Sequence, residues 1–181
     1  MTEHEDPKER KFQGTIRPLA ETDLLQIKPI LETWIRFPVI TGELITEEVE
    51  EVLNEMKKSL QEDAVKKFLI AEGVGGEVMG VMGYQKLREE MNRFAQTDVP
   101  AELINANVSD EHRGNGVGTA LIAAIETSTK KEGYKELLLN SGPRYKDTAW
   151  EFYNKRFGQP VGELKDFYGP DFSAPVWRKV L

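Results

Sequence analysis

The sequence contains no cysteine, and this absence excludes several classes of site at once. No disulfide framework can exist to suggest secretion, and a thiolate nucleophile or a cysteine-ligated zinc site is ruled out. Histidine is nearly absent too, with 2 residues in the 181-residue chain. His4 lies in a polar segment and His112 is otherwise alone, so a histidine-rich metal site and a Ser-His-Asp relay are both disfavoured. We therefore expect no metal.

Long apolar runs are missing as well, and so is any targeting segment. No run of apolar residues approaches the ~20 that a helix needs to span a bilayer. The opening residues, MTEHEDPKERKFQ, carry neither the apolar centre of a secretory signal nor an Arg-rich amphipathic pattern. We predict a disordered tail over residues 1–13, a single domain over residues 14–181, a cytoplasmic location and no membrane partner.

Positive charge is in deficit. The chain has 24 Lys and Arg against 31 Asp and Glu, which gives a net charge of −7. Binding to nucleic acid needs clustered basic residues on one face, so we expect no nucleic-acid partner. An acidic surface suits a cationic or neutral substrate better.

Periodicity and turn residues predict a particular order of strands and helices. Strand patterns cover residues 14–19, 66–73, 77–87, 100–108, 134–142, 160–168 and 174–181. Helical patterns cover residues 22–34, 46–61, 119–131 and 144–158. This order predicts an α/β (α+β) fold in which a central, mostly antiparallel mixed sheet of about seven strands carries four helices on its faces, with a βαβ unit in the middle. The polar connection 88–100 is long for a hairpin, which favours a role for it.

The segment SDEHRGNGVG places three glycines at alternate positions directly before a helix. The first turn of a helix has unpaired N–H groups and a positive dipole end, so it attracts an anion. Glycines remove the Cβ atoms that would hold a phosphate away, and Arg113 adds a positive charge. The G-x-G-x-x-G dinucleotide motif fails at Thr119, and the ATP-type G-x-x-x-x-G-K-[ST] motif is absent. A loop that merely turns a corner is the alternative, although one glycine would suffice for a turn.

The motif R-x-x-G-x-G at residues 113–118 resembles the acetyl-CoA signature of the GNAT (GCN5-related N-acetyltransferase) family. Residues 108–114 resemble that family's V-x-P-x-x-R-G stretch, with Asp110 in place of the proline. The similarity extends over the order of elements from residue 15 to residue 181. It implies the GNAT acyl-CoA acyltransferase fold, acetyl-CoA as cosubstrate, and N-acetyltransferase activity on a primary amine of a small molecule or peptide by direct attack in a ternary complex.

The resemblance also implies how the cosubstrate binds. A V-shaped split opens between the strand that ends at Val108 and the strand over residues 134–139. The pantetheine arm enters this split and pairs with the exposed backbone of the first strand, while the pyrophosphate rests on the backbone amides of the glycine segment. The implied cofactor-binding residues are Ala106, Asn107, Val108, Arg113, Gly114, Asn115, Gly116, Val117, Gly118 and Thr119.

Glu102 is the predicted general base. An amine with a pKa near ~10 is mostly charged at pH 7, so a base or a water relay has to take its proton. Glu102 resembles the glutamate that some family members place on this strand, and partial burial would raise its pKa toward neutrality. A solvated glutamate at the start of a strand is the alternative. Asn105 and Asn107 alternate onto one face of the strand and are candidates for binding substrate or a relayed water.

Tyr153 is the predicted general acid. Residues 149–153, A-W-E-F-Y, resemble the family's A-x-x-F/L-Y element, whose tyrosine hydroxyl points at the thioester sulfur and can protonate the leaving thiolate. Trp150, Tyr153 and Phe157 also form an ordinary apolar stripe of a helix. The two interpretations are compatible, because the ring can pack while the hydroxyl stays free.

The acceptor side is less well defined by the sequence. Candidates for an acceptor pocket are the aromatic residues Trp34, Phe37, Phe167 and Tyr168, with Glu43 or Asp171 to hold a cation. The same residues could belong to the core or to a homodimer interface. Lys146 stands where the family often has an asparagine that contacts CoA. Two other functions stay open: a non-catalytic, regulatory CoA-binding module, and an O-acyltransferase that uses the same cosubstrate.

Overall fold

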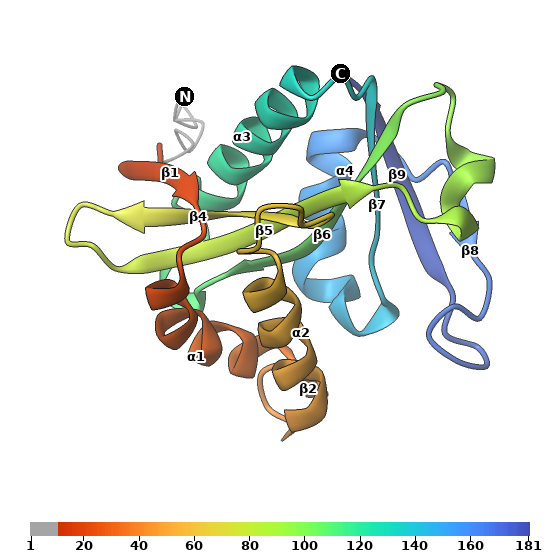
Figure 1. The fold of residues 1–181 in the computed structure, drawn as a ribbon. Coiled ribbons are helices and arrows are strands. Elements are labelled where there is room, and N and C mark those ends of the chain that lie inside the picture. Colours follow the sequence, from red (N-terminus) through yellow and green to blue (C-terminus); the bar gives the residue numbers. More distant parts are fainter. Residues whose placement is uncertain (1–10) are drawn as a thin grey trace, which may run out of the picture.

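A computed structural model describes residues 11–181 of the chain. Residues 1–10, which include His4 and most of the predicted tail, lie outside the described residues. One seven-stranded sheet has the spatial order β1-β4-β5-β6-β7-β9-β8 (Figure 1). Its strands are β1 (Gly14–Pro18), β4 (Lys67–Gly73), β5 (Val78–Lys86), β6 (Pro100–Val108), β7 (Glu136–Asn140), β8 (Gly162–Leu164) and β9 (Ala174–Val180). The predicted α/β fold with a mixed seven-stranded sheet is confirmed.

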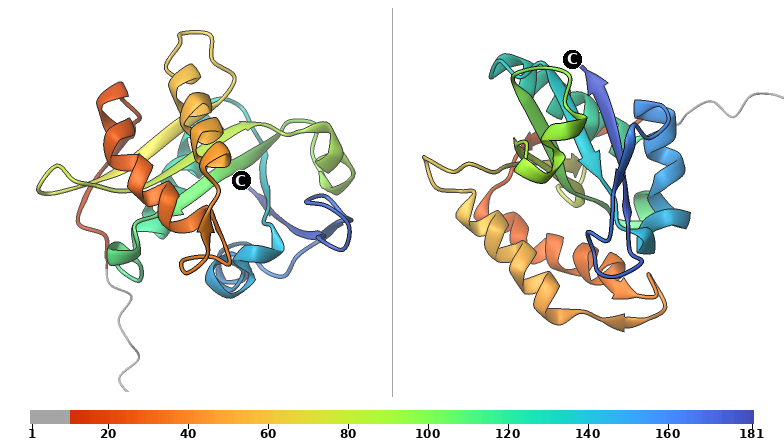
Figure 2. Two further views of the ribbon diagram at one scale, coloured as in Figure 1. Left: turned by 90° about the horizontal axis from the view of Figure 1, so that it is seen from below. Right: turned by 90° about the vertical axis from the view of Figure 1, so that its right-hand side faces the viewer.

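Helices cover both faces of the sheet (Figure 2). They are α1 (Leu24–Trp34), α2 (Thr46–Lys58), α3 (Val117–Lys131) and α4 (Glu151–Phe157). A two-stranded ribbon of β2 (Arg36–Phe37) and β3 (Glu43–Leu44) connects α1 to α2. Short 3-10 helices are η1 (Glu21–Asp23), η2 (Glu89–Phe94), η3 (Asp110–His112) and η4 (Pro143–Tyr145), and η5 (Lys146–Trp150) is a short π-helix. Parallel β6 and β7, joined through α3, form the predicted βαβ unit.

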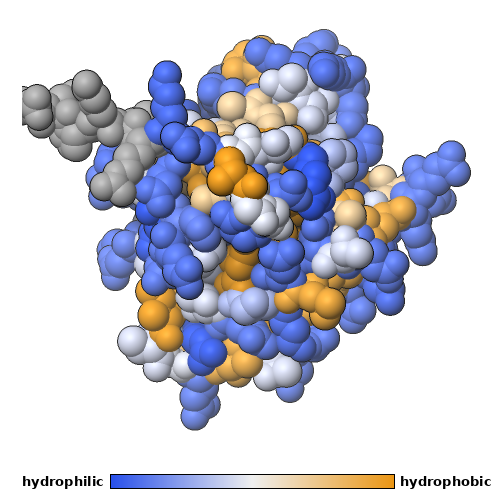
Figure 3. Space-filling model, turned by 90° about the vertical axis from the view of Figure 1, so that its left-hand side faces the viewer, coloured by the Kyte–Doolittle hydropathy of each residue, from blue (hydrophilic) through white to orange (hydrophobic). Residues whose placement is uncertain are grey.

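The core consists of two main layers of apolar side chains, one on each face of the sheet. One layer joins α3 and α4 to the sheet through residues such as Leu121, Ile125 and Trp177. The other joins α1 and α2 to the opposite face through residues such as Leu31 and Met56. The face that carries β1 and the β4–β5 hairpin is mainly hydrophilic, as Figure 3 shows. Apolar residues are therefore gathered inside, as expected when burial of apolar surface drives folding.

The two strands at the centre of the sheet separate partway along their length. Parallel pairing of β6 with β7 joins Pro100, Ala101 and Glu102 to residues 136–138 and then stops. On its other edge, β6 stays paired with β5 as far as Val108. From Leu103 onward, the edge of β6 that faces β7 therefore has no partner strand among the described residues. This is the V-shaped split that the family resemblance implies.

A bulge interrupts β6 within the split. Val81 pairs with Asn107 and Gly83 pairs with Ile104, so two residues of β6, Asn105 and Ala106, lie opposite the single Met82. Asn105 has a positive φ of 47°, a conformation that asparagine tolerates better than most residues. Bulges are common beside active sites because they change the direction of nearby side chains. Here the Asn105 amide turns toward α2, where its Nδ2 lies 3.4 Å from Glu55 Oε2.

Several element boundaries differ from the sequence prediction, and the fourth α-helix begins at Glu151 rather than at residue 144. The second helix ends at Lys58 rather than near residue 61, and strand β8 is confined to three residues. The 88–100 connection contains the η2 helix, in which Met91 is fully buried. Glu136 of β7 accepts hydrogen bonds from the backbone N–H groups of Gln96 and Thr97. The connection is therefore fixed to the sheet, which gives its length a structural explanation.

The start of α1 is held by a buried carboxylate. Asp23 is 3% exposed and receives two hydrogen bonds from Arg17, of 2.7 and 2.8 Å, and a third from the backbone N–H of Ala20. Arg17 also contacts Glu72 of β4, so the cluster links β1, β4 and α1. The ion pair with Arg17 lowers the pKa of the Asp23 carboxyl.

We expect the substitution Asp23→Asn to lower the free energy of unfolding at pH 7 by about 1.5–3 kcal/mol, the range for hydrogen bonds to charged groups. Because the folded-state pKa is lowered, the contribution is complete above the unfolded pKa of about 3.9 and is lost as the pH falls through the folded value. Urea unfolding from pH 7 down to pH 3 measures this. A difference between wild type and variant that stays constant below pH 4 would contradict it.

Candidate active site

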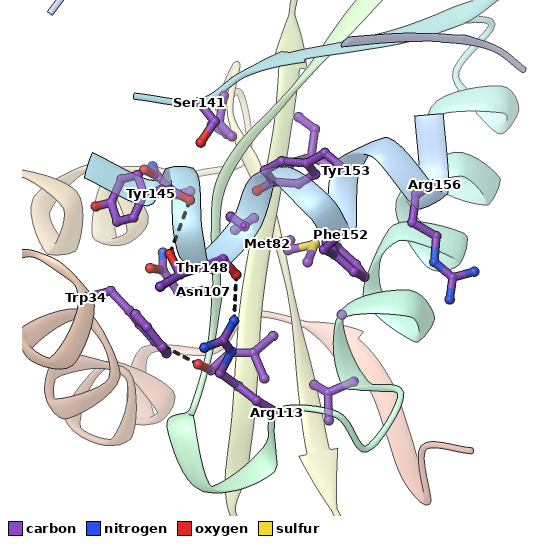
Figure 4. Close-up of a pocket in the computed structure, with 18 of the residues that line it drawn as sticks. Trp34, Met82, Asn107, Arg113, Ser141, Tyr145, Thr148, Phe152, Tyr153 and Arg156 are labelled. Carbon is purple, nitrogen blue, oxygen red and sulfur yellow. Dashed lines mark hydrogen bonds between the residues drawn. The ribbon is translucent and has the colours of Figure 1, made fainter. Parts of the chain in front are cut away.

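The split between β6 and β7 opens into a cleft of about 980 Å³. Its walls come from β6, the loop before α3, the first turns of α3, and the segment from η4 to α4, as the close-up in Figure 4 shows. Nine of the ten predicted cofactor-binding residues line this cleft, and Asn115 does not. The tertiary structure therefore brings the edge of β6 and the glycine segment to one cavity.

The glycine segment presents backbone N–H groups at one end of the cleft. Gly116 caps α3 with φ 78°, and its carbonyl accepts the first helical hydrogen bond, from Ala120. The N–H groups of the first turn therefore have no acceptor within the helix. Gly114 has φ 74° with open space where a Cβ would stand, whereas a Cβ on Gly118 would lie 3.1 Å from the Phe152 ring. A bound anion would meet bare backbone here.

Two arginines flank this end of the cleft, and their positions differ from the expectation. Arg113 donates a 2.5 Å hydrogen bond to the Thr148 carbonyl, and its guanidinium carbon lies 4.9 Å from the centre of the Trp34 ring. The side chain therefore reaches across the cleft, and its charge is not confined to the start of α3. Arg156 of α4 donates a 2.6 Å hydrogen bond to Thr119 Oγ1 in the first turn of α3. Arg156 was not among the predicted site residues, because a helical pattern does not show which neighbour a cation in the last turn will contact.

These features fit the phosphate and pantetheine groups of acetyl-CoA. The exposed edge of β6 offers backbone donors and acceptors to an amide-bearing chain, and one carbonyl there, that of Val108, already accepts a 2.8 Å bond from Trp34 Nε1. The small side chains of Ala120 and Ala123 in α3 also line the cleft, as does Arg156. An anion would find amides, a helix dipole and a cation together.

Tyr153 lies at the inner part of the cleft, and its hydroxyl points into the cavity (Figure 4). The residue is 7% exposed, and its ring packs against the rings of Trp177 and Phe157, with ring centres 5.3 and 6.5 Å apart. No described residue forms a hydrogen bond with its hydroxyl. Burial raises the pKa of Tyr153, so the phenol keeps its proton at neutral pH. The geometry accommodates a packed ring and an available proton together.

Glu102 also lines the cleft, but it is neither solvated nor isolated. It is 1% exposed, and its Oε1 lies 2.6 Å from an Arg88 nitrogen. Its Oε2 accepts hydrogen bonds from the Gln85 side chain at 3.0 Å and the Arg88 backbone at 3.4 Å. The alternative of a solvated glutamate is wrong. A carboxylate held this way is fixed in position, as a proton acceptor needs to be.

The acceptor side contains other residues than those predicted. Of the six candidates, Trp34 and Tyr168 line the cleft, whereas Phe37, Glu43, Phe167 and Asp171 do not. Lys146 is exposed and does not line it either. The structure adds Glu48, Val52 and Glu55 from one face of α2, Arg88 after β5, and Arg144 and Tyr145 from η4. The spacing of 48, 52 and 55 along a helix could have suggested a shared face.

Residues 11–181 contain neither a cluster of metal ligands nor a helix suited to span a membrane. No group of three or more metal-ligating side chains of His, Cys, Asp or Glu occurs in this part of the chain. None of the described helices is both long enough and apolar enough to cross a membrane.

Comparison with known proteins assigns residues 32–159 to the model of the acetyltransferase (GNAT) family. N-acetyltransferase 8 of Rattus norvegicus is 27% identical over 109 residues, which are 60% of this chain and 46% of that protein. N-acetyltransferase family 8 member 2 of the same species is matched over 42% of its length. The chain thus spans about half the length of the curated relatives it matches.

Solved structures share the fold. A GNAT-family protein from Desulfovibrio desulfuricans superimposes with a TM-score of 0.73 at 19% identity and covers 92% of this chain and 98% of its own. An aminoglycoside 6'-N-acetyltransferase complexed with coenzyme A gives a TM-score of 0.67 at 18% identity, over 92% and 96% of the two chains. At these identities the similarity establishes the fold alone.

Proposed function

Because this chain belongs to the acetyltransferase (GNAT) family, we propose that it transfers the acetyl group of acetyl-CoA to a primary amine by direct attack in a ternary complex. The observation that carries the proposal is the split in the sheet. It places an unpaired edge of β6, the amides at the start of α3 and the Tyr153 hydroxyl in one cleft.

Binding of acetyl-CoA would use two kinds of backbone group. The edge from Ala106 to Val108 offers amide and carbonyl groups to the pantetheine arm, and the first turn of α3 offers N–H groups to the pyrophosphate. Arg156, fixed to Thr119, adds a positive charge beside that turn. Acetyl-CoA supplies the acetyl group as a thioester, and transfer replaces its C–S bond with a C–N bond to the acceptor.

Two side chains would manage the protons. Glu102 takes a proton from the acceptor ammonium, directly or through a water, because an amine must be neutral to attack. Tyr153 holds a proton on Oη for the leaving group, and its raised pKa keeps that proton in place at neutral pH. With no cysteine in the chain, an acyl-cysteine intermediate is excluded, which favours direct attack.

A panel of amines incubated with acetyl-CoA, with release of free thiol as the signal, tests the proposed function. We expect thiol release above the background of hydrolysis with at least one primary amine, and the acetylated amine in the products by mass spectrometry. Acetylation of hydroxyl compounds and of no amine would point to an O-acyltransferase. Tight binding of CoA by calorimetry without any turnover would support a non-catalytic CoA-binding module.

A further inference from the structure

The acceptor side of the cleft is electrically balanced, although the chain as a whole carries a net charge of −7. Three glutamates line this side, and each has its own cation. Glu48 pairs with Arg144, Glu55 pairs with Lys66 at 2.6 Å, and Glu102 pairs with Arg88 at 2.6 Å. A polycationic acceptor would require these carboxylates to leave their partners. The balance favours an acceptor that is neutral overall.

Arg88 stands out among these cations because part of its hydrogen-bonding capacity is unused. One terminal nitrogen binds Glu102, whereas the buried Nε has no hydrogen-bond partner among the described residues. A buried donor without an acceptor costs free energy, so such a group calls for a ligand or a water. The guanidinium lies over the Phe167 ring at 5.5 Å and lines the cleft, which holds it in place.

A guanidinium suits one type of ligand group in particular. Its N–H donors form a planar fork that matches the two oxygens of a carboxylate. Glu102 is in contact with the same guanidinium, so an anion site and a cation site lie side by side. A free α-amino acid carries the complementary pair, with its carboxylate and its ammonium on the same carbon atom.

We propose that the acceptor is a free α-amino acid whose carboxylate is bound by Arg88 and whose amine is presented to Glu102. This inference rests on the proposed acetyl transfer and specifies its substrate class. The N-terminus of a peptide has the amine but no adjacent carboxylate, and a polyamine has no carboxylate at all. Arg88 is thereby a specificity-determining residue.

Matched sets of compounds test the proposal. Each set holds a free amino acid, its C-terminal amide and the corresponding decarboxylated amine, for example phenylalanine, phenylalaninamide and phenethylamine, across the proteinogenic side chains. For the preferred side chain we expect kcat/KM of the free acid to exceed that of its amide about 30-fold or more, the effect of one buried charge pair. Equal rates for acid and amide, or a preference for the uncharged forms, would overturn it.

Variants of Arg88 identify the residue responsible. Arg88→Met should remove most of the preference for the acid over the amide while the affinity for CoA, measured by calorimetry, stays within about 2-fold. Arg88→Lys keeps a positive charge beside Glu102 but loses the planar fork of donors, so we expect an intermediate preference for the acid. This variant provides the test if Arg88→Met does not fold. Arg93→Met is the matched control, since Arg93 lies outside the cleft and donates a hydrogen bond to the Glu163 carbonyl. An unchanged preference in both folded Arg88 variants would contradict the assignment.

Binding separates this proposal from the proposed function. Calorimetric titration of each free amino acid of the panel, and of its amide, into the complex of the protein with CoA detects an acceptor site without any turnover. Heat with the acid and none with its amide would support the amino-acid site even if acetyl transfer failed. Acetylation of amides and amines alone would leave the transferase function standing and remove this inference.

Discussion

Replacing Gly118 with glutamate is expected to weaken the binding of acetyl-CoA severely. The new Cβ would lie 3.1 Å from the Phe152 ring, so the ring or the helix start has to shift by a few tenths of an ångström. The added carboxylate would stand in the first turn of α3, where an anion is expected to bind, and would repel it. We expect the Kd for acetyl-CoA, measured by calorimetry, to rise on the order of 100-fold or more, or about 2.7 kcal/mol.

Two controls separate charge, space and stability. Gly118→Ala adds only the Cβ against the movable end of the Phe152 ring, so we expect a much smaller loss of affinity than with glutamate. Val74→Glu adds the same charge in the β4–β5 turn, where Val74 is 89% exposed and lies away from the cleft, and it should leave the Kd unchanged. If Gly118→Glu binds acetyl-CoA as tightly as wild type, the glycine segment is not the phosphate site.

Replacing Tyr153 with phenylalanine is expected to lower kcat about 100-fold or more with little change in the affinity for CoA. The size is typical of losing a positioned acid or base. The substitution keeps the aromatic ring and its contacts with Trp177 and Phe157, so the packing of the core should persist. Because burial raises the pKa of Tyr153, its deprotonation should not lower activity until the pH exceeds about 10, the ordinary value for tyrosine.

Tyr84→Phe is the matched control for this experiment. Tyr84 is also buried, but its hydroxyl donates a 2.7 Å hydrogen bond to Glu132 and it does not line the cleft. We expect this variant to lose some stability, about 1 kcal/mol, and to keep its kcat. A Tyr153→Phe enzyme with the wild-type rate would leave Tyr153 as a packing residue and would point to another proton donor at the inner end of the cleft.

Local patterns in the sequence determined most of the fold and one end of the site. The strand and helix periodicities gave the correct order, and the unbroken Leu137-Leu138-Leu139 run is buried on both faces of β7, as a central strand should be. The glycines were informative because the anion site proposed for them needs only the backbone of adjacent residues, which follow one another in the sequence. The missing cysteine excluded whole classes of chemistry without any structure.

The tertiary structure alone decided which charges meet. Glu102 and Arg88 are 14 residues apart, Arg113 and Thr148 are 35 apart, and Arg156 and Thr119 are 37 apart. Side chains at such separations come together only when the sheet and helices pack, and helical or strand periodicity does not specify their partners. For this reason the sequence could predict a cosubstrate site at its glycines, whereas the proposed acceptor side, with Arg88 between a buried carboxylate and an aromatic ring, could be recognised only in the tertiary structure.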